Sequence, residues 1–211
     1  MRVLLLAALV LSNGYGGLLF TPQAPVPSPK HSPVRKTPPD MGSVTNGTYR
    51  NDSFQFFYRL PFGWVDRTSD IREDTDKSKV LLAIFERPPA ATGTTINSAV
   101  IIAAESVDSY PGLKSADDYF GPLTELTESK GFKVVNEPYE FPLDGRTIIR
   151  KDFTKERGTL QMLQASLVTI EKGYVLSFTF VGGSQDDITE LVENLRFAGP
   201  RKSSRKLEDK K

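Results

Sequence analysis

Residues 132–182 alternate between apolar runs and glycine-containing pairs, and this alternation restricts the fold more than any other feature of the chain. The runs are FKVVNEPYEF, RTIIRKDF, LQMLQASLVTI and YVLSFTFVG, and the pairs that separate the last four segments are Asp144-Gly145, Arg157-Gly158 and Lys172-Gly173. Such apolar runs bounded by turn residues are typical of β-strands. Glycine supplies the positive φ that tight hairpins require. The pattern therefore predicts an antiparallel meander of four strands.

Three further strands are predicted nearer the N-terminus. Residues 53–60, SFQFFYRL, alternate with a period of two, so that one face of a strand is apolar and the other polar. The apolar positions of this strand are Phe54, Phe56, Tyr58 and Leu60. The runs KVLLAIFER at 79–87 and SAVIIAAESV at 98–107 complete the set of predicted strands.

Two segments change to the period of a helix, and each begins with a capping pattern. Ser115 has Asp118 three residues later, and Ser184 has Asp187 at the same spacing. Pro122 weakens the first helix or delays its start, whereas the last segment, SQDDITELVENLRF, has an uninterrupted apolar stripe. That stripe must be buried against a sheet. The predicted fold class is α+β, an α/β/α sandwich with a central antiparallel sheet and a C-terminal amphipathic helix.

The two ends of the chain differ in composition from the predicted domain at residues 45–198. Met1 and Arg2 precede nine apolar residues, which is typical of an export signal over residues 1–20 and is short of the roughly 20 residues that span a bilayer. The alternative is an uncleaved anchor extending to Phe20. Residues 21–44 are predicted to be a proline-rich linker and residues 199–211 a basic, unstructured tail.

Composition excludes several chemistries. The chain has no cysteine, and its one histidine, His31, lies in the proline-rich segment. The core therefore lacks the residues needed for a thiolate nucleophile, a cysteine-bound zinc or a Ser-His-Asp triad. We expect no cofactor. The net charge is +3 for residues 1–45 and +4 for residues 199–211. Because the whole chain has a net charge of +1, residues 46–198 carry a net charge of −6. An acidic body argues against binding to nucleic acid.

An acidic segment, DRTSDIREDTD at residues 66–76, is the candidate metal site. Oxygen ligands in a loop suit calcium, and Asp70, Asp74 and Asp76 are the candidate ligands. The spacing does not match an EF-hand, and Arg67 and Arg72 offset part of the charge. The alternative is a solvated acidic loop.

A second candidate site is the stretch FFYRLPFGW at residues 56–64, where an aromatic strand meets a Pro-x-x-Trp corner. Phe62 and Trp64 are candidate contacts for a partner, because exposed aromatic residues dominate binding hot spots. The alternative is that Trp64 fills one end of the sandwich core, since large aromatic side chains bury a large area.

The order of these motifs resembles the PsbP-like family. The motifs are the aromatic strand leading to LPFGW, SAVIIAAESVDSY followed by KSADDYFGPL, DGRTIIRKDF, EKGYVLSFTF and DDITELVENLRF, and the resemblance covers about residues 47–197. That family includes extrinsic subunits and assembly factors of photosystem II, and it shares its α/β/α sandwich with a Ran-binding import protein. The core here lacks the histidine of the metal contacts in some plant members.

The resemblance implies an exported, non-catalytic binding or assembly module that docks on a protein complex of the envelope or membrane. The expected partner is a protein, and the expected location is the periplasm or the extracellular space, with membrane tethering if the signal is uncleaved. The alternatives are a carboxylate-based hydrolase, motivated by the acidic segment and the tyrosines at strand ends, and a calcium-binding envelope protein, motivated by the acidic segment.

Overall fold

A computed structural model describes residues 40–72, 75, 77–88 and 94–198. The predicted signal, nearly all of the predicted linker and the predicted basic tail lie outside these residues. No helix in the described ranges is both long enough and apolar enough to span a membrane.

The larger of two sheets has eight strands, and every pair in it is antiparallel. Across the sheet the order is β4 (Val65–Asp66), β5 (Ser78–Phe85), β6 (Ala99–Ser106), β11 (Tyr174–Gly182), β10 (Leu160–Glu171), β9 (Arg146–Arg157) and β7 (Lys133–Val134). The remaining strand, β8 (Tyr139–Leu143), pairs with the other half of β9.

The predicted meander is confirmed, with one correction to its first strand. The run at 132–141 does not form one strand: it contributes β7 and the start of β8, which both pair with the long strand β9. Between them Pro138 has no amide donor, and the side chain of Asn136 replaces part of the ladder by accepting a hydrogen bond from the Asp152 amide at 3.0 Å.

Two of the three predicted turn pairs are confirmed. Asp144 with Gly145 and Lys172 with Gly173 have positive φ and connect paired strands directly. The third turn is displaced by one residue, because Arg157 pairs with Leu160 and leaves Gly158 and Thr159 as the two loop residues.

A smaller sheet contains β1 (Ser43–Thr45), β2 (Thr48–Asn51), β3 (Phe56–Arg59) and β12 (Leu195–Phe197), in that order. The strand predicted at residues 53–60 is confirmed only as β3, and Phe54 precedes it in a turn; Phe54, Phe56 and Tyr58 are buried, as the period-two pattern predicts. β12 follows the last helix and pairs with β3, so the end of the domain closes on its beginning.

The described residues form the helices α2 (Thr68–Ile71), α3 (Phe120–Ser129) and α4 (Gln185–Glu193), with short 3-10 turns η1 (Val107–Ser109) and η2 (Asp117–Tyr119). The capping box predicted at the start of the last helix is present in α4. The box predicted at Ser115 does not form as such: the Asp118 carboxylate accepts from the amides of Lys114 and Ser115, and α3 begins only at Phe120. Pro122 then lies in the first turn, where a missing amide is tolerated.

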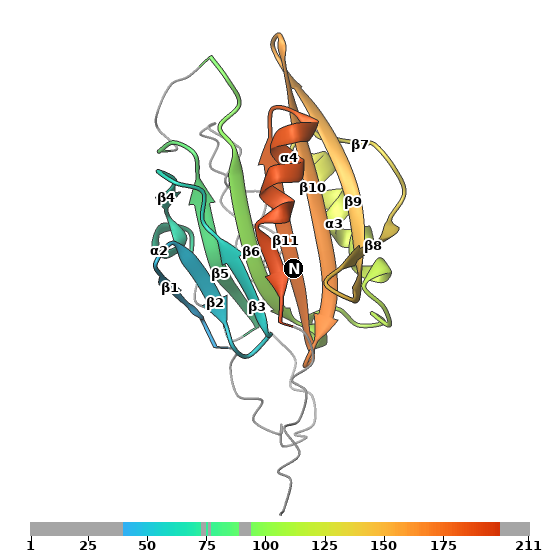
Figure 1. Cartoon of the computed structure of the whole chain (residues 1–211). Coiled ribbons are helices and arrows are strands. Elements are labelled where there is room, and N and C mark those ends of the chain that lie inside the picture. Colours follow the sequence, from blue (N-terminus) through green and yellow to red (C-terminus); the bar gives the residue numbers. More distant parts are fainter. Residues whose placement is uncertain (1–39, 73–74, 76, 89–93, 199–211) are drawn as a thin grey trace, which may run out of the picture.

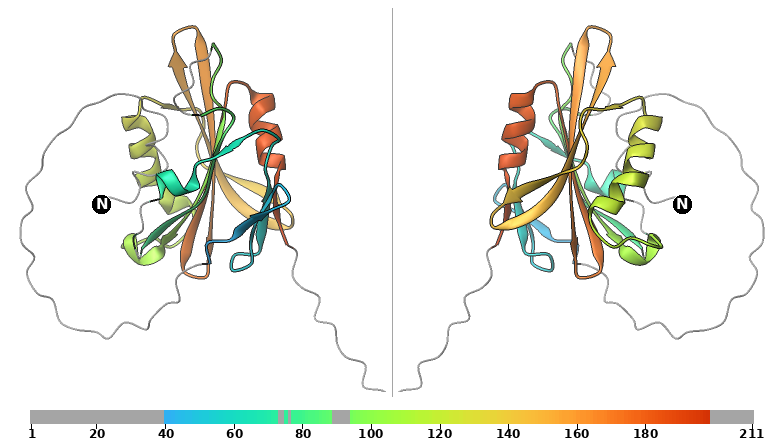
Figure 2. Two further views of the ribbon diagram at one scale, coloured as in Figure 1. Left: turned by 90° about the vertical axis from the view of Figure 1, so that its left-hand side faces the viewer. Right: turned by 90° about the vertical axis from the view of Figure 1, so that its right-hand side faces the viewer.

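The large sheet forms the middle layer of the domain. Figure 2 shows α2 and α3 on one face of this sheet, and the small sheet with α4 on the other. The main core lies between the two sheets and α4, where Phe56 meets Phe178 edge to face at 5.2 Å between ring centroids. The structure confirms the predicted α+β sandwich, and it adds a second sheet to one of the two covering layers.

Candidate functional site

A pocket of about 600 Å³ opens at one end of the sandwich, next to the start of α4. It is lined by the corner Pro61 and Trp64, by Glu86 after β5 and the segment before β6, by the tip of the β9–β10 hairpin, and by one side of α4 with the residues before it. Figure 1 shows this hairpin projecting beyond the start of α4. Segments far apart in the sequence therefore build one concave site.

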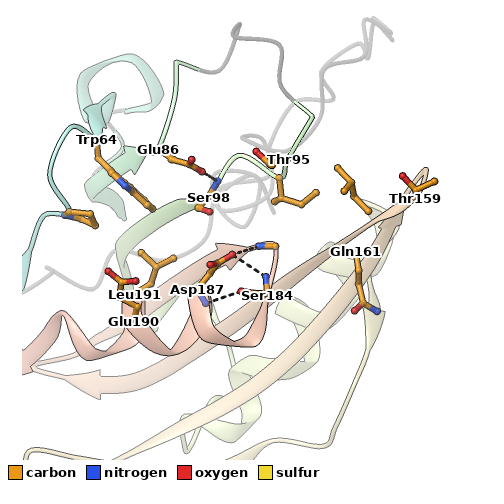
Figure 3. A pocket seen from close by; sticks show the side chains of 14 residues that line it. Trp64, Glu86, Thr95, Ser98, Thr159, Gln161, Ser184, Asp187, Glu190 and Leu191 are labelled. Carbon is orange, nitrogen blue, oxygen red and sulfur yellow. Dashed lines mark hydrogen bonds between the residues drawn. The ribbon is translucent and has the colours of Figure 1, made fainter.

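The apolar part of the pocket comes from Trp64, Ile96, Leu160 and Leu191. Figure 3 shows Trp64 on one wall, and Glu190 and Leu191 on the wall that α4 forms. Trp64 is half-buried and packs against the main core. Gly63, with a φ of 80°, allows the chain to turn there.

Phe62 and Trp64, the two candidate contacts, take different positions. Phe62 is fully exposed, whereas Trp64 contacts the core with part of its ring and lines the pocket with another part. Trp64 therefore lies between the core and the pocket, and Phe62 lies two residues away in the same corner.

On the polar wall of the pocket, at the start of α4, the capping box of the helix holds both Ser184 and Asp187. Asp187 Oδ2 accepts hydrogen bonds from the amides of Gly183 at 2.9 Å and Ser184 at 3.0 Å. The Asp187 amide donates to Ser184 Oγ at 3.1 Å. These bonds satisfy donors that a helix start otherwise presents to a ligand.

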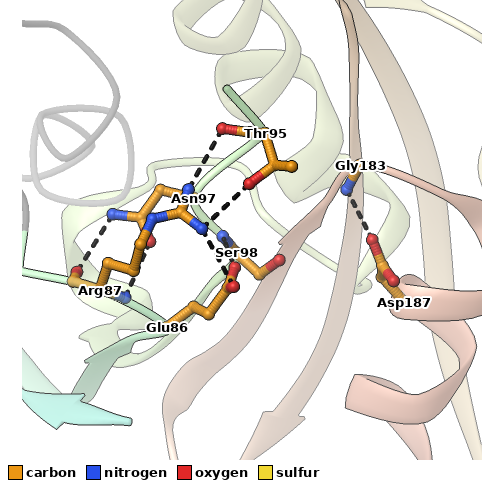
Figure 4. A network of polar contacts seen from close by, with 7 residues as sticks. All are labelled: Glu86, Arg87, Thr95, Asn97, Ser98, Gly183 and Asp187. Atoms are coloured by element: carbon orange, nitrogen blue, oxygen red, sulfur yellow. Dashed lines mark hydrogen bonds and ion pairs between the residues drawn. The ribbon is translucent and has the colours of Figure 1, made fainter. Parts of the chain in front are cut away.

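The opposite rim is held by a network around Glu86 and Arg87, drawn in Figure 4. Glu86 accepts from the Ser98 amide at 3.3 Å and from Arg87 Nη1 at 3.0 Å. Arg87 also donates to Thr95, through Nη1 to Oγ1 at 3.0 Å and through Nη2 to the carbonyl at 3.1 Å. The network orders residues 95–98, of which Thr95, Ile96 and Ser98 line the pocket.

The candidate metal ligands are only partly described. Asp70 is paired with Arg67 and accepts a hydrogen bond from Ser69 Oγ, while Asp74 and Asp76 lie outside the described residues. Within the described ranges, no group of three or more histidine, cysteine, aspartate or glutamate side chains is arranged to hold a metal ion. Asp66, in the same segment, accepts a hydrogen bond from the Thr68 amide at 2.8 Å, where α2 begins.

A buried carboxyl that the sequence did not reveal lies on the other face of the large sheet. Glu105 accepts hydrogen bonds from the hydroxyls of Tyr110 and Tyr119. Burial raises the pKa of the Glu105 carboxyl, and the two hydrogen bonds lower it in part. Glu105 lies toward the end of β6 that is distant from Ser98 and the pocket. Its partners come from turns after the strand, so no local pattern identified the cluster.

Comparison by sequence gives no matching protein family and no matching characterised protein. Among solved structures, the chain is similar to the cyanobacterial PsbP protein CyanoP of Synechocystis sp. PCC 6803, with 15% identity, a TM-score of 0.47, and 74% of this chain and 96% of that chain covered. It is also similar to the Ran-binding protein Mog1p of Saccharomyces cerevisiae, with 10% identity, a TM-score of 0.45 and the same coverage.

A third similar structure is LpqN of Mycobacterium tuberculosis, a protein involved in cell envelope biogenesis, with 12% identity, a TM-score of 0.37, and 68% of this chain and 83% of that chain covered. A PsbP protein, from the family that the motif order resembles, is therefore only one of several proteins that are similar in structure.

Proposed function

We propose that this protein is an exported, non-catalytic binding or assembly module, which receives part of a protein partner in the pocket between Trp64 and α4. The observation that carries the proposal is the pairing of a fully exposed aromatic side chain, Phe62, with a concave site that begins at Trp64. Exposed aromatic residues beside a pocket are the usual anchors of protein interfaces.

The arrangement of the corner supports contact with a macromolecule. Pro61 fixes φ before Phe62, and Gly63 turns the chain after it with a φ of 80°. The backbone around the exposed Phe62 ring is therefore constrained on both sides. Because β3 leads into this corner and is paired on both edges, by β2 and β12, the segment is mounted on a rigid element. Little ordering is then required when a partner binds.

The carboxylates of the pocket favour binding over hydrolysis. Glu86 and Asp187 are each held by backbone amides of the same chain, which are structural contacts. The described carboxyl with a raised pKa, Glu105, does not line the pocket. A hydrolase would require an acid and a base with different environments facing one substrate, and two of the three carboxylates that line this pocket, Glu86 and Asp187, already accept from backbone amides.

Site-specific crosslinking tests the proposal. A photo-reactive phenylalanine analogue replaces Phe62 in the full-length protein, in its own host, and the control places it at Val135, which is also exposed but lies at the β9 edge of the large sheet. We expect one reproducible adduct from position 62 and none of the same mass from position 135. The same adducts from both positions, or none from either, would contradict the proposal.

A further inference from the structure

We infer that the occupant of the pocket is a short basic segment of a protein, in which a lysine or arginine stands beside a large apolar side chain. This inference rests on the proposed function and specifies the chemistry of the partner. Three observations support it: the charge of the lining, the state of the α4 amides, and the position of Trp64.

The charged side chains that the described residues contribute to the pocket are all acidic. Three carboxylates, Glu86, Asp187 and Glu190, line the pocket, and the part of the chain that the structure describes contributes no lysine or arginine to it. The nearby guanidinium of Arg87 is turned to Glu86 and Thr95. Because residues 46–198 carry −6 in total, the wider field has the same sign. Such a field raises the local concentration of cationic groups.

The start of α4 does not offset this preference. A helix N-terminus ordinarily attracts anions through its free amides and its dipole. Here Asp187 already occupies the place of an anion, accepting from Gly183 and Ser184, and Ser184 Oγ accepts from the Asp187 amide. Asp186 adds a second negative charge to the first turn. An acidic ligand would therefore meet two carboxylates, and the amides of Gly183, Ser184 and Asp187 are already used within the chain.

Trp64 and Glu190 determine what kind of cation fits. Glu190 is exposed on α4, and Trp64 lies on the other wall of the pocket. Tryptophan is the aromatic ring that attracts cations most strongly, and a carboxylate opposite it adds to that attraction. Leu160, Leu191 and Ile96 supply apolar surface for a neighbouring side chain. A volume of about 600 Å³ lies within the range of about 300–1,000 Å³ typical of ligand pockets.

The experiment uses the fluorescence of Trp64, which is the only tryptophan of the chain. Full-length protein is titrated at low salt with the peptide Gly-Ser-Arg-Leu-Arg-Ser-Gly, and separately with the peptide in which both arginines are glutamate. We expect a saturable change in emission with the basic peptide and none with the acidic peptide over the same concentrations. The affinity for the basic peptide should fall as salt is added.

Two variants at matched positions of α4 locate the contact. Glu190→Gln is expected to weaken binding of the basic peptide about two- to fivefold, as for an exposed ion pair. Glu193→Gln removes the same charge from the same helix at an exposed position outside the pocket, and is expected to leave the affinity unchanged. Equal losses in both variants would reduce the effect to overall charge and overturn the inference.

Other outcomes also decide between occupants. A response to the acidic peptide equal to that of the basic one would overturn the inference, and emission that changes with protein concentration alone would assign the pocket to a second copy of the chain. If the basic peptide has no effect while crosslinking from position 62 still yields its adduct, the inference fails and the proposed function stands. If the crosslinking also fails, the proposed function is lost as well.

Discussion

The hydroxyl of Tyr119 donates a hydrogen bond of 3.0 Å to Glu105 Oε1, between the helical layer and the large sheet. Tyr110 donates to the other carboxylate oxygen, and its ring meets that of Tyr119 edge to face at 5.2 Å between centroids. Glu105 thereby connects β6 to the segment that leads into α3. This carboxyl is 4% exposed, so its protonation affects the stability of the fold.

Glu105 predicts a specific dependence of stability on pH. Its pKa is raised in the folded protein, so the folded state holds the proton more tightly than the unfolded chain. The stability from this proton is fully present below the unfolded pKa and is lost as pH rises through the folded pKa. In urea unfolding between pH 4 and 8, Glu105→Gln should therefore gain stability relative to the wild type as pH rises, by up to about 1.4 kcal/mol per pH unit. A constant difference would contradict this.

Phe56 and Phe62 should respond very differently to the same substitution. Phe56 is buried between the sheets and contacts Phe178 and Phe197, so Phe56→Ala should lower the free energy of unfolding by about 3–5 kcal/mol. Phe62→Ala removes a fully exposed ring and should change it by less than about 0.5 kcal/mol. Chemical denaturation of both variants measures the difference. A large loss from Phe62→Ala would show that its ring packs against the protein.

Because Ser184 caps α4, replacing it should lower the stability of the fold, and alanine should lower it more than glycine. Ser184→Ala removes the acceptor for the Asp187 amide and should cost about 1 kcal/mol of stability, whereas Ser184→Gly should cost only a few tenths. Thr189→Ala, at an exposed position in the same helix, is the control and should have little effect. Because Ser184 also lines the pocket, loss of the cap should change the emission of Trp64 as well.

Asn136 predicts a local change at the edge of the large sheet. Its side chain donates to Asp152 Oδ2 at 2.8 Å and accepts from the Asp152 amide at 3.0 Å, in the gap between β7 and β8. Asn136→Ala should lower the free energy of unfolding by about 1–3 kcal/mol, because the Asp152 amide loses its partner. Hydrogen exchange should accelerate at Asp152 and Val135. The exposed neighbour supplies the control, since Glu137→Ala should leave these amides protected.

Much of the fold could be predicted from local patterns, and the exceptions have identifiable causes. The turns at Gly145 and Gly173 and the cap at Ser184 were predicted correctly, because positive φ and capping depend on a few adjacent residues. The split of the first meander strand was missed, because Asn136 and Pro138 matter only once β9 extends past them. The helix start at Phe120 was left open by the position of Pro122.

The candidate site was predictable only in part. The sequence drew attention to Phe62 and Trp64, and the structure places the corner beside a pocket. Glu190 and Leu160 had no local signal, since a carboxylate on an exposed helix face and a leucine near a hairpin are common everywhere. Their role follows from the proximity of α4 and the β9–β10 hairpin to the corner.

By itself, the sequence determined the class of the fold, the antiparallel order of the meander, the amphipathic last helix and the absence of thiol and histidine chemistry from the core. These follow from composition, from periods of two and 3.6 residues, and from glycine at turns. Only the tertiary structure decided that β12 joins β3 in a second sheet, that Glu105 is buried beneath two tyrosines, and that Trp64 faces α4 across a pocket. Such pairings depend on which apolar faces are buried together over long distances in the chain, and local preference does not specify that choice.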